Sequence, residues 1–292
     1  MEEAHNQTTL DHAFRYGVLS AVSWITLVVA LPITLVAIYG LYFFIKADHV
    51  APVYAINLLV SDVVQICGNA LSTVWLKDGG KLSDAFYNFY LFGLMASVWF
   101  MVCIAAERYI MIAYPVFFRN IQTVKRAFLV SFTVWMATGI TMVIIMVDDT
   151  ADTYRALTFL LPFPLLTGLF LGSWRVLSKS HSVSPRKRKQ VLGTLALVLC
   201  IYMLFFLPYV VIDFILLKRK RTSTVRYLHL FSEVIIALNP VLDPVLYVFM
   251  RKDAKNILRA FPCFRQVRKC REQSDTPYTN DTAVMDAAET PV

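Results

Sequence analysis

The sequence predicts an all-α fold: a bundle of seven membrane-spanning helices with a short amphipathic eighth helix. Hydrophobic side chains make up 58% of the 292 residues and charged side chains only 16%, whereas soluble domains average about 45–50% apolar and about 25% charged residues. Seven apolar runs are also free of Lys and Arg, and each has about the 20 residues that a helix needs to cross a bilayer. The composition therefore excludes an ordinary soluble enzyme, and seven crossings leave no room for a second folded domain.

The apolar runs set the expected domain boundaries. They cover residues 16–45, 50–76, 82–106, 127–147, 156–174, 191–217 and 227–250. We expect an extracellular N-terminus over residues 1–15, the seven-helix domain over 16–250, an amphipathic membrane-surface helix over 251–262, and a mostly disordered cytoplasmic tail over 263–292. Prolines within the runs should kink the helices, because each removes a backbone hydrogen bond. They are Pro32, Pro162, Pro164, Pro208, Pro240 and Pro244.

Positive charges are concentrated at one end of the predicted bundle. Cytoplasmic loops of membrane proteins carry an excess of Lys and Arg. The segments that we therefore place in the cytoplasm contain Lys46, Arg119, Lys125, Arg126, Arg175, Lys179, residues 186–189 and the stretch from Arg251 onward. The acidic first segment lacks the basic region of a cleavable signal peptide and holds an N-glycosylation sequon at Asn6. We expect a multi-pass plasma-membrane protein with its N-terminus outside, although the basic segment 218–221 then lies on the outer face.

The cysteines lie either within predicted crossings or in the tail. Cys67, Cys103 and Cys200 belong to crossings, whereas Cys263 and Cys270 follow the amphipathic helix. No extracellular disulfide is therefore expected within the chain. Cys263 is a candidate for palmitoylation because it directly follows the amphipathic helix, and an unmodified cytosolic thiol is the open alternative.

Two carboxylates stand in the middle of predicted crossings, where a charge is costly. They are Asp62 in the second crossing and Asp243 in the seventh. Together with Ser97 and Asn239 they would offer oxygen ligands that suit a hard cation such as sodium. The alternative is a protonated carboxylate pair that joins the helices by hydrogen bonds. An allosteric sodium ion is the one cofactor that this pattern suggests.

Short motifs recur at the ends and kinks of the crossings. The third crossing ends in Glu107-Arg108-Tyr109, the sixth contains Phe206-Leu207-Pro208, and the seventh contains Asp243-Pro244-Val245-Leu246-Tyr247. Taken singly, each motif has a plain structural explanation, such as a charged helix end or core packing. In order and spacing, however, the whole chain resembles the rhodopsin-like (class A) G-protein-coupled receptors, and the Asp243 motif resembles their purinergic-like branch. Further residues that carry the resemblance are Asn57, Asp62, Pro115, Trp135, Pro162 and Cys263.

The resemblance implies a receptor rather than an enzyme. An extracellular ligand of unknown class would shift a two-state bundle, and the sixth helix would swing about Pro208 to open a cytoplasmic cleft for a heterotrimeric G protein. Glu107 would hold Arg108 at rest and release it towards Tyr247 in the active state. The switch residues implied in this way are Glu107, Arg108, Tyr109, Phe206, Pro208, Asp243, Pro244 and Tyr247. Further expected partners are arrestin at the tail and membrane lipid, whereas nucleic acid is not expected.

The chain departs from the family's pattern at several positions. Thr34 replaces the usual Asn of the first helix, Phe170 the Tyr of the fifth, and Phe206 the Trp of the sixth. Ser83 stands in the place of the third-helix Cys, and residues 147–154 offer no partner for one. The family's disulfide is therefore missing, and the second outer loop is expected to be unstapled.

The outer halves of the third, sixth and seventh helices would supply the ligand site. The expected residues are Tyr87, Tyr90, Leu94, Tyr209, Asp213, His229 and Glu233. Tyr90 stands where aminergic receptors have Asp, and the acidic pair disfavours a nucleotide. A zwitterion, a peptide or a lipid would suit acidic groups beside the basic segment 218–221, and mutual pairing of these charges is an alternative. Proton sensing is conceivable, although three scattered histidines, His5, His12 and His229, are more often polar surface.

A second class of function is a seven-helix ion transporter or channel that uses the buried Asp62 and Asp243. Transporters of this size are often built from internal repeats with matched broken helices. The helix pattern of this chain contains no such repeat, which favours the receptor.

Overall fold

The computed structural model describes residues 2–45, 53–75, 81–121, 123–147, 151–179, 185–218 and 223–250. Within these residues the secondary structure is helical, and seven helices are long and apolar enough to cross a membrane. They are Ala13–Tyr42, Val53–Trp75, Lys81–Ala113, Val124–Val147, Thr153–Ser178, Gln190–Phe214 and Val225–Pro244. The predicted seven-helix fold is therefore confirmed. The amphipathic helix at 251–262, Cys263 and the tail lie outside the described residues.

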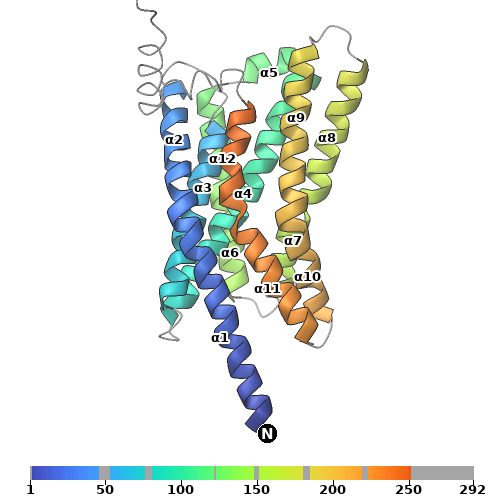
Figure 1. Ribbon diagram of the computed structural model, residues 1–292. Helices are drawn as coiled ribbons and strands as arrows, with labels where there is room; N and C mark the ends of the chain where they lie inside the picture. The colour runs from blue at the N-terminus through green and yellow to red at the C-terminus, as the bar shows by residue number, and fades with distance from the viewer. Residues whose placement is uncertain are drawn as a thin grey trace, which may run out of the picture. The chain divides into compact units, whose positions relative to one another are not determined.

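The crossings are assembled from the helices labelled in Figure 1. The first consists of α1 (Glu2–Ile25), a π-helical turn η1 (Thr26–Ala30) and α2 (Leu31–Ile45). The next three are α3 (Val53–Trp75), α4 (Lys81–Ala113) and α6 (Val124–Val147), with the short helix α5 (Pro115–Ile121) before α6. The last three are α7 (Ala151–Leu160) with α8 (Pro162–Lys179), then α9 (Pro185–Ile201) with a π-helical turn η3 (Tyr202–Phe206) and α10 (Leu207–Lys218), and finally α11 (Ser223–Ala237) with α12 (Asn239–Met250).

Several interruptions of the crossings coincide with prolines. The π-helical turns η1 and η3 end shortly before Pro32 and Pro208, α8 begins at Pro162, and Pro240 follows the junction of α11 and α12. A proline nitrogen carries no proton, so the preceding turn loses a hydrogen bond and either widens or ends. Interruptions were expected at these four positions and are found there. Pro164 and Pro244, in contrast, lie inside α8 and α12 and do not interrupt these helices.

Helix α4 is the central element of the bundle, and it contacts α3, α6, α7, α8 and α9. Its closest approach is to α3, where glycine is required on both helices. A Cβ atom at Gly93 would lie 2.8 Å from the backbone nitrogen of Gln65, and one at Gly68 would lie 2.6 Å from that of Tyr90. Small residues commonly permit such close approach between membrane helices. The contact places the polar centre of α3 directly against α4.

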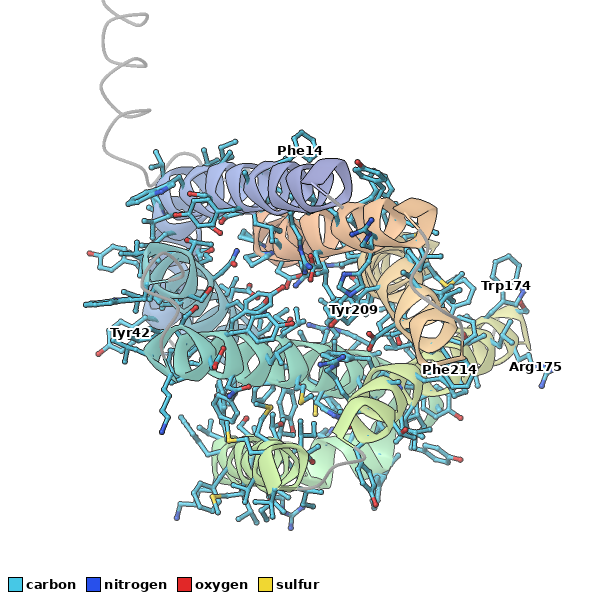
Figure 2. The ribbon with its side chains drawn as sticks, turned by 90° about the horizontal axis from the view of Figure 1, so that it is seen from below. Phe14, Tyr42, Trp174, Arg175, Tyr209 and Phe214 are labelled. Carbon is cyan, nitrogen blue, oxygen red and sulfur yellow. The ribbon has the colours of Figure 1, made fainter. Side chains whose placement is uncertain are left out.

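The outer surface of the bundle is apolar, as a membrane protein requires. Figure 2 shows Phe14, Tyr42 and Trp174 pointing away from the bundle, whereas Tyr209 points into its centre. The three outward side chains are each more than half exposed, and Tyr209 is buried. In a membrane, lipid would surround the outward side chains, so their exposure costs nothing there.

Candidate functional site

An ion pair joins the first and seventh crossings near the end of the bundle at which α1 begins. Arg15 on α1 donates to both carboxylate oxygens of Glu233 on α11, at 2.7 and 2.9 Å. His229, one turn earlier on α11, places Nδ1 3.4 Å from Glu233 Oε1. Both distances start from the same nitrogen, Nη2, and the Glu233 side chain is only 14% exposed, so the contact is a charge-assisted one at a partly buried carboxylate. Glu233 is therefore already neutralised by a neighbouring helix.

A second ion pair joins the fifth and sixth crossings. Arg155 on α7 approaches Asp213 on α10, with Nη2 3.3 Å from Oδ1 and Nε 3.4 Å from Oδ2. The side chains are only 19% and 7% exposed. Salt screens a partly buried pair less than a surface pair. The contact links two crossings whose relative movement the receptor mechanism requires.

The predicted ligand residues meet around these ion pairs. Tyr87 on α4 lies near Glu233, Arg155 and Asp213. We name this group of seven side chains the mouth: Arg15, Tyr87, Arg155, Tyr209, Asp213, His229 and Glu233. The mouth thus draws on α1, α4, α7, α10 and α11.

The two remaining predicted ligand residues lie deeper than the mouth. Tyr90 is buried, with its ring centroid 6.0 Å from that of Tyr87. Leu94 has 0% exposure. In this conformation, therefore, the Leu94 side chain is covered by its neighbours and offers no surface to a ligand.

Sequence reasoning missed Arg15 and Arg155. Each stands immediately before an apolar run, at Tyr16 and Ala156, and was treated only as the boundary of that run. A usable signal existed, because cations at the outer ends of crossings go against the positive-inside rule. In the described part of the chain, Glu233 pairs with Arg15 and Asp213 with Arg155. The side chains of the basic segment 218–221, beside which the acidic residues were expected, lie outside it.

Aromatic contacts lead from the mouth to the interruption in the sixth crossing. The ring of Tyr209 lies 6.0 Å from that of Phe159 in an edge-to-face arrangement, and Phe159 lies 6.2 Å from Phe206. Phe206 stacks on Tyr202 at 5.5 Å, and the Tyr202 hydroxyl donates a hydrogen bond to the carbonyl of Phe159. Both Tyr202 and Phe206 belong to η3. The turn before Pro208 is thus packed directly against the helix that carries Arg155.

The four residues predicted to form a sodium site lie together in the centre of the bundle. Asn239 Nδ2 donates to Asp243 Oδ2 at 2.9 Å, and Ser97 Oγ donates to the same oxygen at 3.4 Å. Asp62 interacts electrostatically with Asp243 and accepts a hydrogen bond of 3.2 Å from Gln65 Nε2. All five side chains are buried, and Gln65 was not anticipated from the sequence.

This cluster contains more acceptors than donors. With both carboxyl groups ionised, four of its oxygens have no hydrogen-bond partner in the described part of the chain: Asp62 Oδ2, Gln65 Oε1, Asn239 Oδ1 and Asp243 Oδ1. A proton on one carboxyl group would instead allow a hydrogen bond between Asp62 and Asp243. An unpaired buried oxygen is costly. The cluster therefore has the chemistry to accept a hard cation or a proton, and the residues present fit either one.

Glu107 and Arg108 lie next to each other near the end of α4, and the predicted hold of Arg108 by Glu107 stays a prediction. No ion pair joins the two side chains within the described residues, and both Glu107 Oε2 and Arg108 Nε are buried without a hydrogen-bond partner there. Tyr109 contacts the ring of Tyr114 at 6.5 Å. Tyr247 belongs to α12, but its side chain lies outside the described residues.

Trp135 has a defined polar contact in addition to its packing. Its Nε1 donates to Asn57 Oδ1 at 2.9 Å, and Asn57 Nδ2 donates in turn to Ser131 Oγ at 3.2 Å. These bonds join α3 to α6. Asn57 and Trp135, which both carry the family resemblance, are thus joined by a hydrogen bond.

Comparison with known proteins agrees with this arrangement of motifs. The family model described as "7 transmembrane receptor (rhodopsin family)" matches residues 33–156 and 151–247. The chain belongs to the rhodopsin family of receptors. G-protein coupled receptor 68 of Homo sapiens is 26% identical over 83% of this chain and 76% of its own length. Proteinase-activated receptor 2 of Bos taurus is 25% identical over 82% of this chain and 71% of its own length.

Membership of this family decides between the two classes of function. The chain is a G-protein-coupled receptor, a multi-pass plasma-membrane protein that transmits the binding of an extracellular ligand to a G protein. The ion transporter or channel that would use Asp62 and Asp243 is not favoured.

Proposed function

We propose that the mouth binds a ligand that carries both a positive and a negative charge, such as a zwitterion or a short peptide. The observation that carries this proposal is that both acidic side chains of the mouth are paired with an arginine from another crossing. A ligand with a single charge would satisfy only one member of a pair and leave its partner poorly compensated, which is costly in a partly buried site. A ligand with both charges can replace both partners at once.

The proposal requires that the mouth faces the outside. The positive-inside rule supports this orientation, because the basic stretches around Arg119, Lys125 and residues 186–189 lie at the other ends of the crossings. The acidic first segment with its sequon at Asn6 supports the same orientation. Glycosylation of Asn6 stays a prediction.

We infer that the ligand acts on the sixth crossing through the contacts of Tyr209 and Phe159. A ligand that separates Arg155 from Asp213 would free α10 from α7 and change the packing of Phe206. π-helical turns are often found at functional sites, and η3 lies directly before Pro208. Movement of the cytoplasmic half would then open the site at Arg108 to the G protein. Spatial contact alone does not establish coupling, so the chain of contacts needs a functional test.

Sodium would act on the same equilibrium from the buried cluster. The oxygens of Asp62, Ser97, Asn239 and Asp243, with Gln65 beside them, would hold the ion. An ion bound more tightly to the resting state stabilises that state by linkage and lowers agonist affinity. The competing idea is a carboxylate pair that shares a proton, which predicts a dependence on pH with little dependence on sodium.

The remaining expectations concern the branch and the cytoplasmic side. We infer from the Asp243 motif that the chain is nearest in motif to the purinergic-like branch. Arrestin binding to the tail, contact with lipid, and palmitoylation of Cys263 are proposals of the same kind, since these residues lie outside the described part of the chain.

The ligand class can be tested in cells that express the receptor. Amino acids and short peptides with free termini would be screened with a parallel readout of several G-protein classes. For an active compound, we expect that blocking either its amine or its carboxylate lowers potency at least tenfold, and that Asp213→Asn has a similar effect. Asp84→Asn is the control, because Asp84 is exposed in the first turn of α4. Full potency of both blocked analogues would contradict the proposal.

A further inference from the structure

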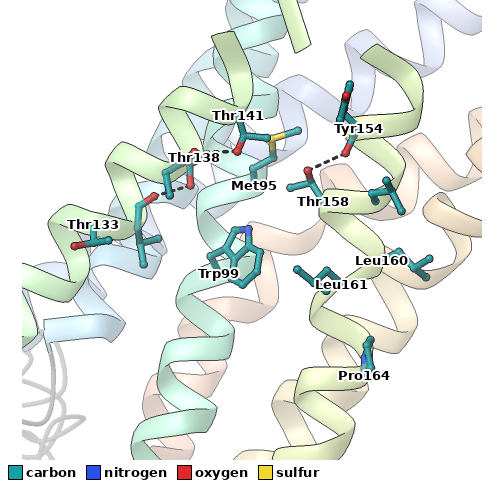
Figure 3. Close-up of a pocket in the computed structure, with 13 residues that line it drawn as sticks. Met95, Trp99, Thr133, Thr138, Thr141, Tyr154, Thr158, Leu160, Leu161 and Pro164 are labelled. Atoms are coloured by element: carbon teal, nitrogen blue, oxygen red, sulfur yellow. Dashed lines mark hydrogen bonds between the residues drawn. The ribbon is translucent and has the colours of Figure 1, made fainter. Parts of the chain in front are cut away.

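A separate cavity lies between α4, α6 and α7 (Figure 3). Its volume is about 720 Å³, within the range of about 300–1,000 Å³ that is typical of small-molecule sites. Residues from three crossings line it, and no residue of the mouth or of the buried polar cluster is among them. The lining residues include Met95, Trp99, Thr138, Thr141, Leu157 and Thr158.

The cavity opens towards the lipid. Leu157 and Leu161, on its α7 side, are each 52% exposed and lie within the membrane span Thr153–Ser178. Met95, on its α4 side, is buried. A ligand would therefore enter sideways from the membrane rather than through the mouth.

The walls of the cavity are effectively apolar. The hydroxyl groups of three lining threonines donate hydrogen bonds to backbone carbonyls of their own helices. Thr138 donates to Val134 O at 2.8 Å, Thr141 to Ala137 O at 2.9 Å, and Thr158 to Tyr154 O at 2.8 Å. The dashed lines in Figure 3 mark these bonds. No charged residue lines the cavity in the described part of the chain. A charged or zwitterionic headgroup would find no counter-charge there and would pay a large desolvation cost.

Two side-chain donors of the lining have no hydrogen-bond partner among the described residues, the indole N–H of Trp99 and the hydroxyl of Tyr154. The Trp99 side chain is partly buried and its indole Nε1 makes no hydrogen bond with any described residue, whereas a buried Trp N–H usually finds a partner. Trp135, the neighbouring membrane Trp in α6, does donate its N–H, at 2.9 Å to Asn57. Trp99 is thus available to a ligand that accepts a hydrogen bond.

Acceptors are available on the opposite wall. In a regular helix the carbonyls of Thr158 and Leu160 would accept from the residues four positions later, which here are Pro162 and Pro164. Proline has no N–H, so neither helical bond can form. Both residues line the cavity, and Figure 3 shows them across from Trp99. The cavity thus combines the Trp99 N–H with two carbonyls that lack their usual helical donor.

We propose that this cavity binds a neutral lipid alcohol of the sterol class. A hydroxyl is the smallest group that can accept from Trp99 Nε1 and donate to a carbonyl of α7 at once. A sterol has one hydroxyl and an otherwise apolar body, which matches walls without charge. Its rigid rings lose little conformational freedom on binding, in contrast to an acyl chain.

The proposal is tested with the full-length receptor in phosphatidylcholine nanodiscs that contain a photoreactive cholesterol analogue. We expect saturable labelling of peptides from α4, α6 or α7, and competition by excess cholesterol. Cholesterol methyl ether, which can accept but not donate, should compete at least threefold more weakly. Trp99→Phe keeps an aromatic ring but removes the donor, and it should weaken labelling about threefold to tenfold.

A matched pair of variants separates this cavity from general lipid contact. Leu157→Trp fills the opening and should abolish saturable labelling, whereas Leu165→Trp, at a lipid-exposed position outside the lining, should leave it unchanged. Labelling that is not saturable, or that both variants reduce equally, would overturn the proposal. Competition by a monoacylglycerol but not by cholesterol would overturn the sterol assignment. The competition experiments on the unmodified receptor decide the question even if a variant does not fold.

Discussion

A methyl group added at Gly93 should destabilise the receptor, because α3 and α4 touch there through their backbones. The new Cβ atom of Gly93→Ala would lie 2.8 Å from Gln65 N and 2.9 Å from Ser61 O. Neither backbone atom can rotate away, so the helices must separate by several tenths of an ångström. Overpacking of this kind typically costs about 1–3 kcal/mol.

Gly193→Ala is the matched control. It makes the same change in a helix interior, but its new Cβ atom would have nothing within 4 Å. Alanine in a helix is favoured over glycine by roughly 0.5–1 kcal/mol, and this gain applies to both variants. The difference in stability between the two variants therefore isolates the clash, and it should be about 1–3 kcal/mol in favour of Gly193→Ala.

The assay is thermal unfolding of the purified variants in one detergent. We expect Gly93→Ala to unfold at a temperature several degrees below that of Gly193→Ala, since about 1 kcal/mol corresponds to roughly 2–4 °C for a chain of this size. Gly93→Ala should also weaken any dependence of the midpoint on sodium, because the clash displaces Gln65 beside the buried cluster. Equal midpoints for the two variants would refute the close approach of α3 and α4.

Three further predictions test other parts of the structure. Asp62→Asn should reduce the fall in agonist affinity that sodium causes at constant ionic strength, because the cluster loses a formal charge; an unmodified receptor that is indifferent to sodium would remove the metal assignment. Mild extracellular reductant should leave binding unchanged, since the three cysteines of the described residues are free and lie in crossings; loss of binding would show a disulfide. Trp135→Phe should lower thermal stability by about 0.5–1.5 kcal/mol, because the bond to Asn57 is lost, and an unchanged midpoint would argue against that bond.

The fold followed from the sequence because the bilayer imposes a simple length rule. Every crossing must satisfy its backbone within an apolar run of about 20 residues, so the seven runs define the seven helices. The interruptions near Pro32, Pro162, Pro208 and Pro240 were predictable for a similarly local reason, because a proline has no N–H to donate to the preceding turn. The π-helical form of η1 and η3 was not predictable, since it depends on how neighbouring helices pack against each turn.

The candidate site was only partly predictable. The buried cluster was found because each carboxylate is unusual by itself in a membrane, and the structure brings Asp62 and Asp243 together. The partners of Asp213 and Glu233 were not found, because ion pairs between helices depend on side-chain direction and on which helices are neighbours. The expected hold of Arg108 by Glu107 belongs to the resting state of the receptor and stays a prediction.

The most direct test of the receptor mechanism is nucleotide exchange on purified heterotrimeric G proteins by the receptor in nanodiscs, with an active ligand from the screen. The unmodified receptor should accelerate exchange on at least one class of G protein. Arg108→Ala should bind the ligand with nearly unchanged affinity and lose the acceleration, because Arg108 lies at the end of α4 remote from the mouth. Normal acceleration by Arg108→Ala would contradict the mechanism.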